Sequence, residues 1–309
     1  MASKDHLRKG ENTEVALSLV AGSVSGMMAR TLTAPMDTVK IRLQVIPAGS
    51  KAGEIGIWKI ITDLARQEGL RGFWKGNVPG SAMYVVYGGV QFSSYSFYNN
   101  SLSGIGWTPQ FHSWVVGALA GITSSIVSYP FDVLRTRFAA DRQVKLSSFS
   151  KTVGEIWSNK GYKGFFKGCC SSMLVISMGT SIMFGTYENI RVYCDLTRSE
   201  YGSKRWHRTL ENSASSLGAT FAKLVTFPLD TSRRRLVISD STNFSPFTQK
   251  TVVYERHRGA GVFKIGLQIL RHEGIFALYR GLPLALLKSV PTTALTFWAY
   301  EACMRVLAN

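Results

Sequence analysis

The chain has 309 residues, and 36 Lys and Arg against 19 Asp and Glu give it a formal net charge of +17. Hydrophobic residues make up 45% and charged residues only 18%, a composition that excludes an intrinsically disordered chain. The basic excess indicates an anionic partner. Nucleic acid, phospholipid head groups and anionic small molecules all meet that description, and composition does not choose among them.

Six stretches nearly free of charge follow one another along the chain. Residues 76–131 contain no Asp, Glu, Lys or Arg, and this length accommodates two membrane-spanning helices of about 20 residues each. The other four stretches hold at most one charged residue each and are rich in the small residues that helix packing in lipid uses. They are 15–36, 168–187, 212–229 and 282–300. The pattern predicts six membrane spans and argues against a nucleic-acid-binding protein.

No catalytic or metal-binding constellation accompanies these spans. The four Cys form no C-x-x-C pair, the five His show no ligand spacing, and no phosphate-binding G-x-x-x-x-G-K-[ST] loop is present. No carboxylate, His or Cys constellation lies within a span. We therefore expect no catalytic residue, no metal and no resident cofactor, in a protein that is not an enzyme.

A Pro–x–acid–x–x–base motif recurs three times, at spacings of 95 and 98 residues. The copies are PMDTVK at 35–40, PFDVLR at 130–135 and PLDTSR at 228–233. Each is followed by an amphipathic stretch and then by an aromatic–base–Gly block, which closes at Gly76, Gly168 or Gly281. A Pro inside a span kinks the helix because it removes one backbone hydrogen bond. Each repeat therefore reads as kinked helix, surface helix, helix.

The fold class that follows is an all-α membrane protein with six transmembrane helices in three pseudo-symmetric repeats, with short surface helices between the spans. We place the surface helices at 57–66, 153–159 and 262–272. The repeats are expected at 1–108, 109–205 and 206–309, within one integrated transmembrane domain.

The acid and the base of each motif are three residues apart, so they share one face of a helix. Together the three repeats supply three acids and three bases, which can close a neutral ring between neighbouring helices. The simpler alternative is pairing within each helix or contact with head groups, at about 0.2–1 kcal/mol per pair. Threefold repetition beside a Pro kink favours a gate. The six residues are Asp37, Lys40, Asp132, Arg135, Asp230 and Arg233.

Three further cations lie inside the apolar stretches. Arg30 and Lys223 each precede a motif acid by seven residues, which places them on the same helix stripe as the motif charges, and Lys288 lies near mid-span of the last helix. An ionisable group at mid-membrane is a functional-site hypothesis, although Arg30 could instead extend to the interface. With no acid inside the same apolar stretches, they favour a multivalent organic anion as ligand, such as a phosphate or pyrophosphate.

These motifs resemble the mitochondrial carrier family over nearly the whole chain. The resemblance implies a threefold pseudo-symmetric bundle in the mitochondrial inner membrane that cycles between cytosol-facing and matrix-facing states as a monomer. It adds Gln44 to the matrix-side ring. The family's cytosolic motif is complete only at Glu188 and Arg191. The third repeat keeps Glu301 but has Met304 at the base position, and the first repeat lacks both charges, which predicts a weak cytosolic gate.

The resemblance also implies substrate contacts seven or eight residues beyond each closing glycine. These positions are Met83, Tyr84, Val175, Ile176 and Lys288. Tyr87 joins them as a second ring that could stack on a ligand, although both tyrosines could equally be packing residues.

Each aromatic–base–Gly block is implied to open an even-numbered helix and bind cardiolipin through its backbone N–H groups, within the inner-membrane lipid. Generic anchoring of the basic side chains at the interface is compatible with this role. The residues are Lys75, Gly76, Lys167, Gly168, Arg280 and Gly281.

Within the family, runs such as PMDTVKIRLQ and KSVPTTALTFWAYE are most similar to those of members that carry thiamine pyrophosphate. Transport of thiamine pyrophosphate as substrate, in exchange for another phosphate compound, is therefore the expectation that the resemblance implies. A nucleotide or coenzyme A carrier of the same fold is the alternative, since adenine phosphates also need several cations. The residues themselves carry the argument only as far as a multivalent organic anion.

Overall fold

The computed structural model describes residues 2–46, 56–106, 108–141, 149–201, 205–239 and 260–307. The regular structure in these ranges is helical. Its α-helices are α1 (Ala2–Val45), α2 (Ile57–Gln67), α3 (Asn77–Leu102), α4 (Pro109–Ala140), α5 (Phe149–Lys160), α6 (Cys169–Tyr201), α7 (Arg205–Ile238), α9 (Val262–Glu273), α10 (Ile275–Leu278) and α11 (Leu282–Leu307). Two 3₁₀ turns, η1 (Leu70–Trp74) and η2 (Gly161–Phe166), precede α3 and α6.

The described residues repeat one order of elements three times. A long helix with an internal Pro is followed by a short helix, a single turn and a second long helix. The first long helices α1, α4 and α7 contain Pro35, Pro130 and Pro228. The second long helices are α3, α6 and α11. This order confirms the predicted all-α fold of three repeats.

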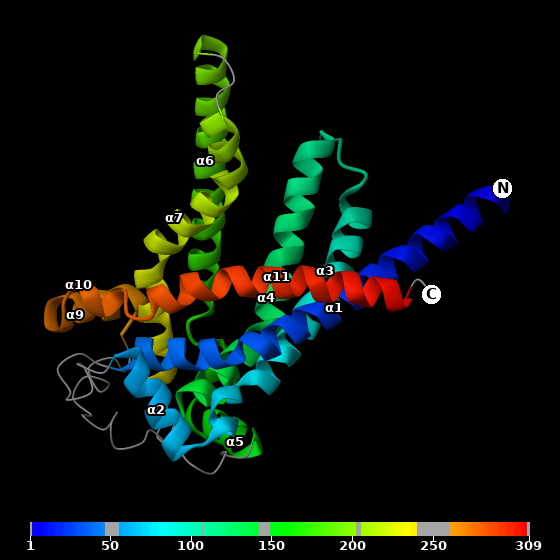
Figure 1. Cartoon of the computed structure of the whole chain (residues 1–309). Coiled ribbons are helices and arrows are strands. Elements are labelled where there is room, and N and C mark those ends of the chain that lie inside the picture. Colours follow the sequence, from blue (N-terminus) through cyan, green and yellow to red (C-terminus); the bar gives the residue numbers. More distant parts are fainter. Residues whose placement is uncertain are drawn as a thin grey trace.

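The six long helices form three side-by-side pairs, α3 with α4, α6 with α7, and α1 with α11. Figure 1 shows the pairs diverging from a shared junction, at which the C-terminal ends of α1, α4 and α7 come together. A buried apolar cluster from these three ends fills the junction, and it consists of Ile41, Val45, Ala139, Ala140 and Ile238. The three Pro-containing helices are therefore held together at one end only.

The short helices α2, α5 and α9 each bury one apolar face beside this junction. In α2 the buried residues are Ile60 and Leu64, which pack with Val39 and Leu43 of α1. The opposite face of α2 is open, and Trp58 is 79% exposed. Their amphipathic pattern made these helices predictable from sequence.

The glycines that close the aromatic–base–Gly blocks form tight corners. Gly76, Gly168 and Gly281 have φ values of +81°, +84° and +87°, a region that side chains disfavour. Space is also restricted at each corner. A Cβ atom on Gly76 would lie 2.7 Å from the carbonyl oxygen of Arg135. The corner glycines therefore let the start of each second long helix approach a first helix of another repeat.

By length and composition alone, two segments of the described residues are apolar enough to cross a membrane, Phe111–Ala140 and Phe149–Thr197. The sequence predicts six spans. The remaining four are diluted by small residues, and three of them contain one charged residue each, Arg30, Lys223 or Lys288. Their long helices nevertheless expose large apolar side chains, such as Phe97 at 65%, Val290 at 74% and Trp298 at 62%. Such exposure suits contact with lipid.

We predict that Gly76→Ala lowers the thermal unfolding temperature of the purified protein in detergent more than Gly161→Ala does. Both glycines have positive φ, but a Cβ on Gly161 meets nothing within 4 Å. Both variants place a side chain at positive φ, at a cost on the order of 1 kcal/mol, so their difference isolates the clash with α4. Equal shifts for the two variants would contradict the close approach.

Candidate functional site

The charged residues of the three motifs pair between helices. Arg135 of α4 donates to Asp37 of α1 at 2.8 Å, and Lys40 of α1 donates to Asp230 of α7 at 3.2 Å. Arg233 of α7 bonds Asp132 of α4. The three bridges join α1 to α4, α4 to α7 and α7 to α1. The structure thus brings the six predicted residues together as a ring of interhelical pairs.

Two more residues contact the ring at Asp230. Gln44, which sequence analysis includes, donates from Nε2 to the Asp230 carboxylate at 3.3 Å. Arg234, which sequence analysis missed, approaches the same carboxylate at 3.5 Å. The run of three arginines at 233–235 was the available signal. With Arg234 the ring carries four cations to three acids, so it is positive rather than neutral.

Beyond the ring, two buried arginines tie the first helices to the short helices. Arg42 of α1 makes a bidentate pair with Glu68 at 2.6 and 2.9 Å, and Arg235 of α7 makes the same pair with Glu273 at 2.5 and 2.9 Å. In each case an Arg seven residues after the motif Pro meets the acid before the second block. In the second repeat Lys160 stands at the acid position. The sequence patterns did not predict these two pairs.

The basic residues of the aromatic–base–Gly blocks point to helix ends of a neighbouring repeat. Lys75 Nζ lies 3.4 Å from the Asp141 carbonyl after α4, and Lys167 Nζ lies 2.8 Å from Ser239 Oγ after α7. Arg280 Nη1 lies 3.3 Å from the carbonyl oxygen of Ile46, after α1. Cations are favourable at these negative helix ends. Lipid binding by these blocks stays a prediction, and these contacts add a bracing role between repeats.

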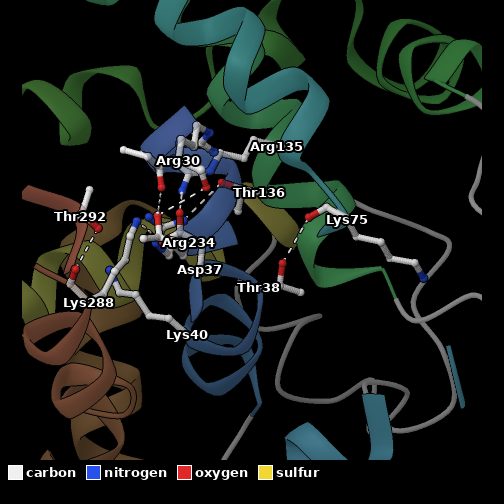
Figure 2. A network of polar contacts seen from close by, with 12 residues as sticks. Arg30, Asp37, Thr38, Lys40, Lys75, Arg135, Thr136, Arg234, Lys288 and Thr292 are labelled. Atoms are coloured by element: carbon white, nitrogen blue, oxygen red, sulfur yellow. Dashed lines mark hydrogen bonds and ion pairs between the residues drawn. The ribbon is translucent and has the colours of Figure 1, made fainter. Parts of the chain in front are cut away.

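The three cations predicted for the substrate divide into two groups. Arg30 is buried and packs over the Tyr84 ring, with Cζ 5.2 Å from the ring centroid. Lys288 of α11 donates to Asp37 at 2.6 Å. Figure 2 shows Arg30 and Lys288 on either side of Asp37. Lys223 is exposed at the wall of a cavity that neither Arg30 nor Lys288 lines.

This cavity of about 350 Å³ lies between α3, α4, α6 and α7, beside the ring. Five of its lining residues were predicted as substrate contacts, namely Met83, Tyr87, Val175, Ile176 and Lys223. The lining also contains residues that sequence analysis missed, among them Ser128, Tyr129 and Phe227. Arg30, Tyr84 and Lys288 do not line it. The cavity combines cations, hydroxyl groups and aromatic rings, which suits an anion with an aromatic part.

The residues predicted for the cytosolic gate are not brought together. Glu188 and Arg191 are exposed on α6, and the described residues show no ion pair for either. Glu301 pairs only within α11, with Arg305 at 3.8 Å, where both side chains are exposed. α6 and α11, which carry these charges, belong to different helix pairs, and the pairs diverge away from the junction (Figure 1).

Glu68 follows α2, outside the spans, and its carboxylate is buried between two cations. Lys75 Nζ lies 2.5 Å from Oε2, in addition to the bidentate contact with Arg42. Burial alone would raise the pKa of Glu68, but hydrogen bonds and charge from Arg42 and Lys75 outweigh it and lower the pKa below 4.5. Glu68 is therefore ionised wherever the fold is intact near neutral pH.

Six long helices in three repeats, closed at one end by ion pairs around a basic cavity, define a membrane transporter. The profile of the family described as "Mitochondrial carrier protein" matches residues 11–105, 106–195 and 207–309. The chain belongs to this family. It is a multi-pass transporter of the mitochondrial inner membrane and not an enzyme. The repeat bounds 1–108, 109–205 and 206–309 stay a prediction.

Several fungal relatives named "Mitochondrial thiamine pyrophosphate carrier 1" are similar over almost their full length. The Saccharomyces cerevisiae protein (strain S288c) is 49% identical, with 98% of each chain covered. The Candida glabrata protein is 46% identical over 99% of this chain and 100% of its own. The Kluyveromyces lactis protein is 45% identical over 97% of this chain and 94% of its own.

We predict that Glu68→Gln destabilises the protein by about 3 kcal/mol at neutral pH, because it leaves Arg42 and Lys75 buried without their counter-ion. A lowered carboxyl pKa supplies stability above the ordinary value of 4.5, and this stability is lost as pH falls through the folded-state pKa. The gap in unfolding temperature between wild type and variant should therefore shrink below about pH 4.5. Asp63→Asn, a half-exposed carboxylate on α2, is the control. A gap that does not change with pH would refute the assignment.

Proposed function

We propose that this chain transports thiamine pyrophosphate across the mitochondrial inner membrane by alternating access, in exchange for another phosphate compound. The observation that carries the proposal is the excess of cations at the centre of the bundle. Arg30 and Lys288 flank a single acid, Asp37, and Lys223 lines the neighbouring cavity. A pyrophosphate supplies the negative charge that balances these cations.

The remaining lining suits the ring-bearing part of this substrate. Thiamine pyrophosphate carries a neutral pyrimidine and a cationic thiazolium beside its phosphates. Tyr87 offers an aromatic ring to this part of the ligand, and Met83, Val175 and Ile176 offer apolar contact. The substrate names of the relatives point to the same molecule.

The ring of interhelical pairs serves as the matrix gate in this proposal. It consists of Asp37, Lys40, Asp132, Arg135, Asp230 and Arg233, with Gln44 as a brace at Asp230. Each bridge can break and form again during the transport cycle, since its side chains keep 9–16% exposure to solvent. Glu188, Arg191 and Glu301 serve as a weaker cytosolic gate that forms when the helix pairs converge.

The proposed partners are the organic phosphate substrate and the surrounding lipid, with the carrier acting as a monomer that binds no nucleic acid. Cardiolipin binding is proposed at the backbone N–H groups that follow Gly76, Gly168 and Gly281. The corner glycines support this, because each one begins a helix whose first N–H groups have no partner within the helix.

A counter-exchange panel in liposomes tests the substrate. Purified protein is reconstituted with internal thiamine pyrophosphate, and uptake of the labelled molecule is measured. Thiamine monophosphate, ADP, ATP and coenzyme A are then supplied as competing or internal substrates. Preference for thiamine pyrophosphate is expected. Faster exchange of a nucleotide or of coenzyme A, with no uptake of thiamine pyrophosphate, would overturn the proposal.

We predict that Lys288→Ala lowers uptake of thiamine pyrophosphate at least about tenfold, since a charged hydrogen bond to phosphate contributes about 1.5–3 kcal/mol. The unfolding temperature should change little, because Lys288 keeps 21% side-chain exposure. Lys264→Gln, an exposed cation on α9 of the same repeat, is the matched control. Near-normal uptake by Lys288→Ala would contradict the site.

A further inference from the structure

The carboxylate of Asp37 is shared by two cations that the proposed function assigns to different tasks. Its Oδ2 accepts from Arg135 at 2.8 Å, and this is a bridge of the matrix gate. Its Oδ1 accepts from Lys288 at 2.6 Å, and Lys288 belongs to the proposed substrate site (Figure 2). One residue thus joins the gate to the site.

The other two gate acids have no such link among the described residues. Asp132 pairs with Arg233, and Asp230 pairs with Lys40 and Arg234, all from the first long helices. The second long helices α3 and α6 carry only uncharged residues at the places that correspond to Lys288. In the part of the chain that the structure describes, a cation from a second long helix therefore reaches the ring only at Asp37.

The surroundings of Asp37 carry more positive charge than one carboxylate balances. Arg30, Arg135 and Lys288 converge on it (Figure 2), which leaves an excess of two positive charges. Arg30 is buried against Gly80 and Tyr84, and its Nε has no hydrogen-bond partner. A phosphate group with two negative charges matches this excess. A phosphate bound here would contact Lys288, which in this structure is already paired with Asp37.

We infer that Asp37 is the resident counter-ion of the substrate site, and that an incoming phosphate competes with it for Lys288. This inference rests on the proposed function. The Asp37 carboxylate neutralises Lys288 while the carrier is empty. A phosphate that takes over Lys288 removes one of the two ionic contacts of Asp37, the one that joins α1 to α11. The gate bridge to Arg135 then remains as the other ionic contact of Asp37.

Binding measurements on purified protein in detergent test this competition without requiring transport. The affinity for thiamine pyrophosphate is measured by calorimetry for wild type, Asp37→Asn and Asp132→Asn. Both substitutions neutralise one gate acid, but only the first releases Lys288. We expect Asp37→Asn to bind about fivefold more tightly than wild type, which corresponds to about 1 kcal/mol, and to bind more tightly than Asp132→Asn. Equal affinities of the two variants, or weaker binding by Asp37→Asn, would overturn the inference.

A double-mutant cycle identifies Lys288 as the shared cation. In a Lys288→Gln background, Asp37→Asn should no longer increase affinity, because the cation for which the carboxylate and the phosphate compete is absent. An undiminished increase in that background would show that Asp37 acts through general repulsion of anions, and this too would overturn the inference.

A matched pair of double variants covers the case in which Asp37→Asn fails to fold. Asp37→Asn with Arg135→Gln and Asp132→Asn with Arg233→Gln each remove one whole bridge, so neither leaves an unpaired gate charge. The first should bind the ligand about fivefold more tightly than the second. Similar affinities would contradict the competition.

The failure of the proposed function is distinguishable from the failure of this inference. If wild-type protein binds no thiamine pyrophosphate, the substrate assignment fails, and the same variants are compared with inorganic pyrophosphate as the probe. If wild type binds thiamine pyrophosphate but the Asp37 and Asp132 variants respond alike, the substrate assignment stands and the competition fails.

Discussion

The architecture depends on ion pairs formed between the C-terminal ends of three kinked helices. Asp37, Asp132 and Asp230 each accept a cation from a different helix, and these bridges lie against the apolar cluster at the ends of α1, α4 and α7. These side chains are largely shielded from water, and the cost of removing both charges from water offsets much of the attraction between them, which suits contacts that must break in each cycle. The permanent connections are the buried Arg–Glu pairs, which hold the short helices to α1 and α7.

Positive charge is concentrated where the helices converge, and in the proposed function this charge selects an anionic substrate. Together with Arg234 the gate holds one cation more than it has acids, and Arg30, Lys223 and Lys288 add to the excess. Uncompensated charge within a membrane protein is costly, so an anionic ligand that balances it stabilises the loaded carrier. The distribution is also uneven, because α11 brings a cation to Asp37 while α3 and α6 bring apolar or aromatic residues. A threefold scaffold thus presents a site that has no threefold symmetry.

Local patterns made the repeats, the order of the helices and the charged motifs predictable from sequence. The spacing of Pro35, Pro130 and Pro228 and the amphipathic short helices contain that information. The ion pairs between helices were harder to predict from sequence, since they depend on how each helix is rotated against its neighbours. The contact of Lys288 with Asp37 spans 251 residues and has no sequence signature. Lys75, Lys167 and Arg280 were predicted at the lipid surface, but their side chains also reach the helix ends of neighbouring repeats.

The central claim is that the ring of bridges closes the matrix end, and cysteine accessibility tests it directly. Ser172 lines the cavity and is half-buried, so Ser172→Cys is introduced after the four native cysteines are replaced by Ser. A membrane-impermeant maleimide is then applied to vesicles from the matrix side, without substrate. Cys at 172 should be protected with the ring intact, labelled in Asp132→Lys, and protected again in Asp132→Lys with Arg233→Asp. Labelling that is the same in all three proteins would contradict the claim.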